Sequence, residues 1–190
     1  MTITELIEKR RTIRKFSQKS VDGKLLEKYI ELASIAPSGA NLQPLKYIAV
    51  SSSEYAEKLF PLVKWAGYLA PDYNPKEGER PTAYIIVLGD SNIRENGYDM
   101  DVGAAVEHII LAALEDGIGS CWMGSVDRPE VAKLFEVPEE LKISCVIAMG
   151  YPAEEPRKTE VKDGNIKYYL EGNTLCVPKR DKDEIIFGKY

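Results

Sequence analysis

Four positive charges lie within six residues near the start of the chain, in the stretch RRTIRKF. The cluster consists of Arg10, Arg11, Arg14 and Lys15. Planar guanidinium groups donate paired hydrogen bonds to phosphate oxygens, and the hydroxyl of Thr12 supplies a further donor. The residues therefore indicate a phosphate-binding segment. From these residues alone, a solvated basic patch stays open as the alternative.

The rest of the composition makes this cluster a local feature. The chain has 190 residues and a net charge of -5, which disfavours a general nucleic-acid binder. No apolar run approaches the ~18 residues of a membrane span, so we expect a cytoplasmic protein without a membrane partner. The length suits one domain over 1–190, in which 64–80 forms a substrate flap and 151–190 a C-terminal extension.

Hydrophobic periodicity places strands between helices around one sheet, a pattern that fits both α/β and α+β folds. Strands are predicted at 45–50, 82–90, 120–124 and 142–150. Helices are predicted from Thr2 and at 23–36, 54–60, 99–116 and 128–135. Residues 151–190 are predicted to be irregular, with a possible hairpin around Gly172-Asn173.

The predicted helix 99–116 is apolar nearly all round, with Leu111 and Leu114 lying away from the face that Val106 and Ile109 share. Such a helix must be buried on most sides. In a domain of this size we expect a second subunit to cover it, and a central helix of a monomer is the alternative.

Several kinds of site are excluded by the residues themselves. With one histidine, His108, the chain has no paired-histidine metal site, and we expect no metal. Neither a GxSxG elbow, a P-loop nor a GxGxxG turn occurs. Three cysteines without a CxxC pair predict buried, reduced thiols.

Four stretches, in order, resemble the nitroreductase family of flavoproteins: RRTIRKFS, APSGANLQP, GIGSCWMGS and VPKR. The resemblance runs from about residue 5 to 187 and selects the α+β class. It implies a three-layer fold with a central, mostly antiparallel sheet flanked by helices. It also implies a homodimer with FMN bound tightly in two interface sites.

The resemblance also implies roles for individual residues. The phosphate of FMN would be held by Arg10, Arg11 and Thr12, with Lys179 or Arg180 closing that end. Arg14 would reach the ribityl chain and the N1/O2 edge of the flavin. Further contacts, from the partner subunit, would come from Ser38, Gly39, Asn41 and Gln43. At the ring, Gly124 and Ser125 would present a backbone N–H to flavin N5.

The implied activity is hydride transfer from NADH or NADPH through flavin N5 to a nitroaromatic or quinone-like acceptor. No side chain need act as acid or base, because the flavin carries the chemistry. Trp65, Tyr68 and Tyr73 would either stack on planar substrates or pack in the fold. Three alternatives stay open: a dehalogenase-like reductase of a halogenated phenol, a flavin-binding or redox-sensing module without efficient turnover, and a basic patch for RNA or another anionic partner.

Overall fold

The computed structural model describes residues 1–69 and 71–190, and its centre is a four-stranded sheet with strand order β1-β2-β4-β3. Its strands are β1 (Leu45–Val50), β2 (Ala83–Asp90), β3 (Gly119–Met123) and β4 (Leu141–Gly150). All three neighbouring pairs are antiparallel. The four predicted strands are confirmed to within a residue or two at their ends.

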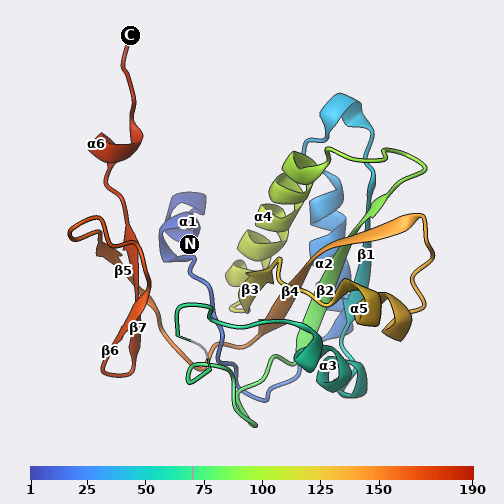
Figure 1. Ribbon diagram of the computed structural model, residues 1–190, viewed down its shortest axis with the longest axis horizontal. Helices are drawn as coiled ribbons and strands as arrows, with labels where there is room; N and C mark the ends of the chain where they lie inside the picture. The colour runs from blue at the N-terminus through green and yellow to red at the C-terminus, as the bar shows by residue number, and fades with distance from the viewer. Residues whose placement is uncertain (70) are drawn as a thin grey trace.

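Six α-helices and two short 3₁₀ turns accompany the sheet in the described residues (Figure 1). They are α1 (Ile3–Lys9), α2 (Gly23–Ser34), η1 (Gly39–Asn41), α3 (Ser53–Leu59), η2 (Phe60–Leu62), α4 (Asp99–Glu115), α5 (Arg128–Leu134) and α6 (Lys182–Ile185). Side-chain caps define where several of them begin, because a cap satisfies backbone N–H groups that lack helical partners. Thr2 and Glu5 form a capping box, and Asp22 and Asp127 cap α2 and α5.

Two apolar layers sandwich the sheet, and strand β2 shows how they are built. Its side chains Ile85 and Val87 join the cluster formed with α2 and α4. Tyr84, Ile86 and Leu88 join the opposite cluster, with α3, α5 and the segment after η2. Each aliphatic side chain buried in this way contributes about 1.5–3 kcal/mol. The three-layer α+β fold with a mostly antiparallel sheet is therefore confirmed.

The C-terminal part differs from the irregular chain that was predicted. It contains a second sheet of order β5-β7-β6, set to one side of the central sheet in Figure 1. Its strands are β5 (Arg157–Glu160), β6 (Tyr169–Glu171) and β7 (Thr174–Lys179). The hairpin is confirmed as β6–β7, with Gly172 at a φ of 59°. Strand β5 escaped prediction because its sequence, RKTE, lacks hydrophobic alternation and it pairs in parallel with a strand far along the chain.

Residues 64–69 and 71–80 form a coil that is partly built into the core. Trp65 and Tyr73 are buried, at 6% and 5% exposure, so packing accounts for both. Tyr68 is 54% exposed, and its ring centre lies 4.9 Å from that of Tyr168. Within the predicted flap, Ala70 lies outside the described residues. A substrate flap stays a prediction for this segment.

Helix α4 lies against both α1 and α2 (Figure 1) and ends at Glu115, and Gly117, just beyond it, has the positive φ of 77° typical of a helix C-terminus. Leu111 and Leu114 stay half-buried. Among the described residues, no helix is long and apolar enough to cross a membrane. All three cysteines are free and buried, as predicted.

Candidate functional site

The arginine-rich segment leaves α1 and runs along the open edge of β3. Thr12 bridges Ser120 in parallel, and the amide of Ile13 donates to the Ser120 carbonyl oxygen at 2.9 Å. Gly119 allows this approach, since an added Cβ would lie 2.7 Å from Cγ1 of Ile13. Because Gly119 has no side chain, the cationic segment can lie directly against the sheet.

A cavity of about 520 Å³ opens beside this segment. Its walls come from Lys9, Arg10, Arg11 and Ile13, from Ile110 and Leu114 of α4, from Ile118 to Ser120, and from Pro152 to Pro156. The size falls within the ~300–1,000 Å³ range of small-molecule sites. The lining combines three basic residues and two glutamates with aliphatic side chains, and the basic and aliphatic groups suit a ligand with an anionic end and an apolar body.

Lys179 of β7 and Lys158 of β5 extend the positive charge beside Arg11. The three residues line a second hollow of about 600 Å³ next to the first. Burial, with the positive charges of Arg10, Arg11 and Lys158, lowers the pKa of the Lys179 ammonium. Burial and Arg10 likewise lower the pKa of Arg11. Positive groups that depress one another's pKa favour an anion between them.

The pairing of these cations within the protein is incomplete. The Nε of Arg11 is buried and has no hydrogen-bond partner in the part of the chain that the structure describes. Among the described residues, the one acidic partner of Arg10 is Glu107, with 3.9 Å between the arginine Nε and Oε1 of the carboxylate. Arg180, in contrast, donates to Glu184 at 2.9 Å within its own helical turn. Of the two predicted C-terminal cations, the structure brings Lys179 to the cluster and turns Arg180 to a local partner.

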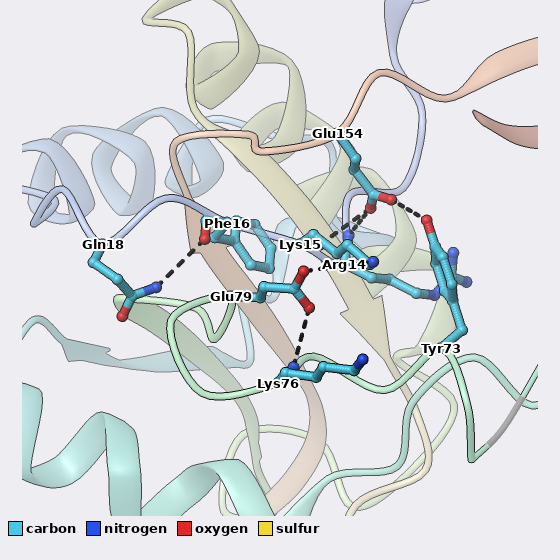
Figure 2. Close-up of polar contacts among 8 residues, drawn as sticks. All are labelled: Arg14, Lys15, Phe16, Gln18, Tyr73, Lys76, Glu79 and Glu154. Atoms are coloured by element: carbon cyan, nitrogen blue, oxygen red, sulfur yellow. Dashed lines mark hydrogen bonds and ion pairs between the residues drawn. The ribbon is translucent and has the colours of Figure 1, made fainter. Parts of the chain in front are cut away.

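Arg14 lies further along the same segment, where its guanidinium stacks 4.8 Å from the ring centre of Tyr168. Its Nε is buried and has no hydrogen-bond partner within residues 1–69 and 71–190. The backbone amide of Arg14 donates to Oε1 of Glu154 at 2.5 Å, as Figure 2 shows. Arg14 is therefore fixed at the backbone while its side chain keeps an unused donor.

Gly124 and Ser125 follow directly after β3, whose direction the segment from Thr12 to Arg14 shares. Nothing would lie within 4 Å of a Cβ added to Gly124, so its backbone is open to approach. Their carbonyl oxygens are used by Arg128 Nη2 at 3.1 Å and by the Lys64 amide at 3.1 Å. Gly124 and Ser125 therefore lie just beyond the C-terminal end of β3, on the same sheet edge as the arginine-rich segment.

The predicted contacts of the loop before β1 gather elsewhere, at the start of α4. Asp101 accepts hydrogen bonds from Ser38 Oγ at 2.8 Å and from the Gly39 amide at 3.0 Å. The Ser38 Oγ in turn accepts from the Gln43 amide at 3.0 Å. Asn41 and Gln43 both have positive φ, which sets a tight and exposed turn.

This loop and the cationic cavity lie at opposite ends of α4. Asp101 is in its first turn, while Leu114, near its end, lines the cavity. The rise of an α-helix puts these two positions roughly 20 Å apart. Within one chain, therefore, the loop residues do not join the arginines.

Four residues with a role here were absent from the sequence-based prediction: Asp101, Ser120, Glu154 and Lys158. Each acts through a partner distant in the sequence, and of the four only Ser120 lies within a motif quoted in the sequence analysis. In the part of the chain that the structure describes, no group of His, Cys, Asp or Glu side chains could hold a metal ion.

The fold and the cavity define an α+β protein with a cavity lined by basic residues beside the edge of its central sheet. The family model described as "Nitroreductase family" matches residues 7–151, and the chain belongs to this family.

Individual proteins agree with the family match. An Archaeoglobus fulgidus protein, provisionally named NADH dehydrogenase/NAD(P)H nitroreductase, is 33% identical over 166 residues, 84% of this chain and 90% of the relative. The iodotyrosine deiodinase of Thermotoga neapolitana is 26% identical over 183 residues, 86% of this chain and 96% of the relative. The solved structure of an FMN-dependent nitroreductase from Clostridium difficile R20291 superposes with a TM-score of 0.66 at 24% identity. That match covers 89% of this chain and 98% of the other, and it shows the shared fold.

Proposed function

We propose that this protein is an FMN-dependent oxidoreductase that uses NADH or NADPH, with 1–190 forming one FMN-binding domain. The observation that carries the proposal is the incompletely paired cluster of Arg10, Arg11 and Lys179, of which the two arginines line a cavity of about 520 Å³ and Lys179 lines the neighbouring hollow. A dianionic phosphate would satisfy these groups, because charge-assisted hydrogen bonds to phosphate are strong and guanidinium geometry suits them.

The residues present fit FMN at both ends of the molecule. Arg10, Arg11, Thr12 and Lys179 would hold the phosphate, and Lys158 would add a fifth group from β5. Arg180 would contribute less, since its guanidinium is engaged by Glu184. The buried, unpartnered Nε of Arg14 supports a role toward the ribityl chain and the N1/O2 edge.

At the ring end, this chain would supply backbone groups and charge, with no catalytic side chain and no metal. Gly124 and Ser125 would present a backbone N–H to flavin N5, and the open space around Gly124 supports this close approach. Arg14 would stabilise the negative charge of the reduced cofactor. The chemistry that FMN supplies when bound is hydride transfer from NADH or NADPH to a nitroaromatic or quinone-like acceptor.

A homodimer with two interface sites accounts for the remaining predicted contacts. Ser38, Gly39, Asn41 and Gln43 are remote from the cavity of their own chain, so a partner subunit would have to bring its loop there. Three exposed apolar side chains near this loop support a covered surface: Ile35, Leu42 and Met100, at 74%, 45% and 84% exposure. Size-exclusion chromatography with light scattering tests the dimer, and a monomer at working concentration would contradict it.

The test of the cofactor is the visible spectrum of the purified protein, with the heat-released compound identified by chromatography. We expect flavin absorption bands and about one FMN per chain. A colourless protein that also fails to take up added FMN would overturn the proposal. Slow NAD(P)H oxidation with every acceptor, despite full occupancy, would instead favour a flavin-binding or redox-sensing module.

A second candidate function is reductive dehalogenation of a halogenated phenol. Its support is the similarity to the Thermotoga neapolitana deiodinase across 86% of this chain. Assays of the reduced holoprotein with a halogenated phenol and with a nitroaromatic, side by side, separate the two. Halide release faster than nitro reduction would favour the dehalogenase.

A further inference from the structure

Three chain segments that are distant in the sequence meet at one carboxylate, that of Glu154. This residue lies in the linker between β4 and β5 and is half-buried. Figure 2 shows its side chain between the arginine-rich segment and Tyr73 of the 64–80 coil. We expect this meeting point to have a functional role, because the arginine-rich segment belongs to the proposed FMN site and 64–80 is the predicted substrate flap.

Both oxygens of the carboxylate are engaged. Oε1 accepts from the Arg14 amide at 2.5 Å and from the Lys15 amide at 3.1 Å. Oε2 accepts from the hydroxyl of Tyr73. Burial and this hydrogen bond raise the pKa of Tyr73 well above its ordinary value, so the hydroxyl remains a donor. A single side chain thus sets the path of the backbone at Arg14 relative to a buried tyrosine.

A second tie, through Glu79, holds the same two segments together. The Phe16 amide donates to the Glu79 carbonyl oxygen at 2.9 Å, and Lys15 Nζ lies 3.5 Å from Glu79 Oε1. These contacts involve Lys15 and Phe16 and do not include Arg14. Glu154 therefore holds the backbone of Arg14 directly, while Tyr168 contacts its guanidinium.

We propose that Glu154 is a positioning residue for the flavin site, which fixes Arg14 through its backbone and couples it to the 64–80 segment through Tyr73. The inference rests on the proposed function, because the role of Arg14 toward FMN belongs to that proposal. Glu154 itself need not touch the cofactor. It acts by holding the backbone of Arg14, whose guanidinium the proposed function directs toward FMN.

The chain offers a matched control one residue away. Glu155 also lines the cavity but makes no side-chain hydrogen bond or ion pair within the described residues. Glu154→Gln and Glu155→Gln remove the same charge at nearly the same place, and only the first weakens the acceptors of the junction. Tyr73→Phe removes the third bond and keeps the ring in the core.

The experiment measures FMN binding to apoprotein by quenching of flavin fluorescence. Relative to wild type, we expect Kd to rise at least five-fold in Glu154→Gln, and to stay level or fall in Glu155→Gln. Tyr73→Phe should weaken binding by a smaller factor, and the double variant should bind no worse than Glu154→Gln alone, since both changes break one junction. Equal Kd values in the two Gln variants, or fully additive effects with Tyr73→Phe, would overturn the inference.

A readout at saturating FMN separates positioning from loss of stability. The midpoint potential of bound flavin should be lower in Glu154→Gln than in Glu155→Gln, because a displaced Arg14 stabilises the reduced cofactor less. Equal potentials would count against positioning. In the apoprotein, amide hydrogen exchange at Arg14 and Lys15 should quicken in Glu154→Gln and not in Glu155→Gln.

The outcomes distinguish this inference from the proposed function. Wild-type protein that fails to bind FMN overturns the proposed function and the inference with it. Wild-type binding with an unchanged Glu154→Gln variant overturns the inference alone. If Glu154→Gln does not fold, Tyr73→Phe carries the test, and an unchanged Kd and an unchanged potential in that variant would overturn the coupling.

Discussion

Ser38 and Asp101 are joined by a 2.8 Å hydrogen bond from the serine Oγ to the aspartate Oδ2, which fastens the loop before β1 to the first turn of α4. Asp101 is buried and also accepts from the Gly39 amide, with Arg94 Nη1 at 3.9 Å. The carboxylate therefore organises the exposed turn that the proposed dimer would present to its partner's cavity.

Asp101→Ala should lower the free energy of unfolding by about 2 kcal/mol, since hydrogen bonds to a charged group contribute roughly 1.5–3 kcal/mol. Urea denaturation measures this loss. Asp99→Ala is the control, because Asp99 lies in the same helical turn but is exposed, and its loss should cost less than about 1 kcal/mol. Equal losses in the two variants would show that the effect belongs to the helix terminus and not to the loop.

Lys179 and Arg180 are adjacent in sequence and differ in what surrounds them. Lys179 lies among Arg10, Arg11 and Lys158, while Arg180 pairs with Glu184. Lys179→Ala should therefore weaken FMN binding by about ten-fold or more, and Arg180→Ala by much less, as expected from the loss of one charge-assisted hydrogen bond. Titration of the apoproteins with FMN checks this, and a larger effect at Arg180 would contradict the placement.

Gly119→Ala should disturb the site through strand β3, against which the cationic segment packs. The added methyl group would meet Ile13 at 2.7 Å and Pro152 at 2.9 Å, so the cationic segment would have to move away from β3. Overpacking of this kind costs about 1–3 kcal/mol, and FMN binding should weaken together with stability. Gly67→Ala serves as the control, because nothing lies within 4 Å of its added Cβ. Thermal unfolding and FMN titration of both variants decide, and an unaffected Gly119→Ala would exclude the close contact.

Asp116 gives the protein an acid-sensitive contact between α4 and α2. Its Oδ2 lies 2.8 Å from Lys28 Nζ and accepts from the Tyr29 hydroxyl at 3.0 Å. The hydrogen bond from Lys28, opposed by burial and aided by Tyr29, lowers the pKa of the Asp116 carboxyl below its ordinary value of 3.8.

Between the lowered folded-state pKa and that ordinary value, the unfolded chain binds the extra proton. The stabilisation is therefore complete above the ordinary value and is lost as the pH falls through the folded-state pKa. Asp116→Asn should be less stable than wild type near pH 6, and the difference should shrink below about pH 4. Urea denaturation at both pH values tests this, and a difference that grows on acidification would refute it.

Local sequence signals predicted much of the fold. The capping residues Thr2, Asp22 and Asp127 all occur where a helix was expected to begin, because a cap acts within three residues of itself. Strands β2 and β4 were found because their apolar runs are long and continuous, and β1 and β3 because short apolar runs lie between turn residues. Strand β5 was missed because its own residues show no alternation of apolar and polar side chains, and its pairing with β7 begins at Arg157 and Cys176.

For the site, the sequence by itself determined the chemistry: a dense group of guanidinium donors, a short polar turn and small residues after a buried strand. Only the tertiary structure decided which of these meet. In the folded chain Lys158 and Lys179 lie beside Arg11, whereas Arg180 pairs with Glu184. The loop that contains Ser38 lies at the opposite end of α4 from these cations. The tertiary structure also made Glu154 the link between Arg14 and Tyr73. Residue types and short spacings set what a group can bind, whereas its neighbours depend on strand pairing and helix packing between segments up to 140 residues apart.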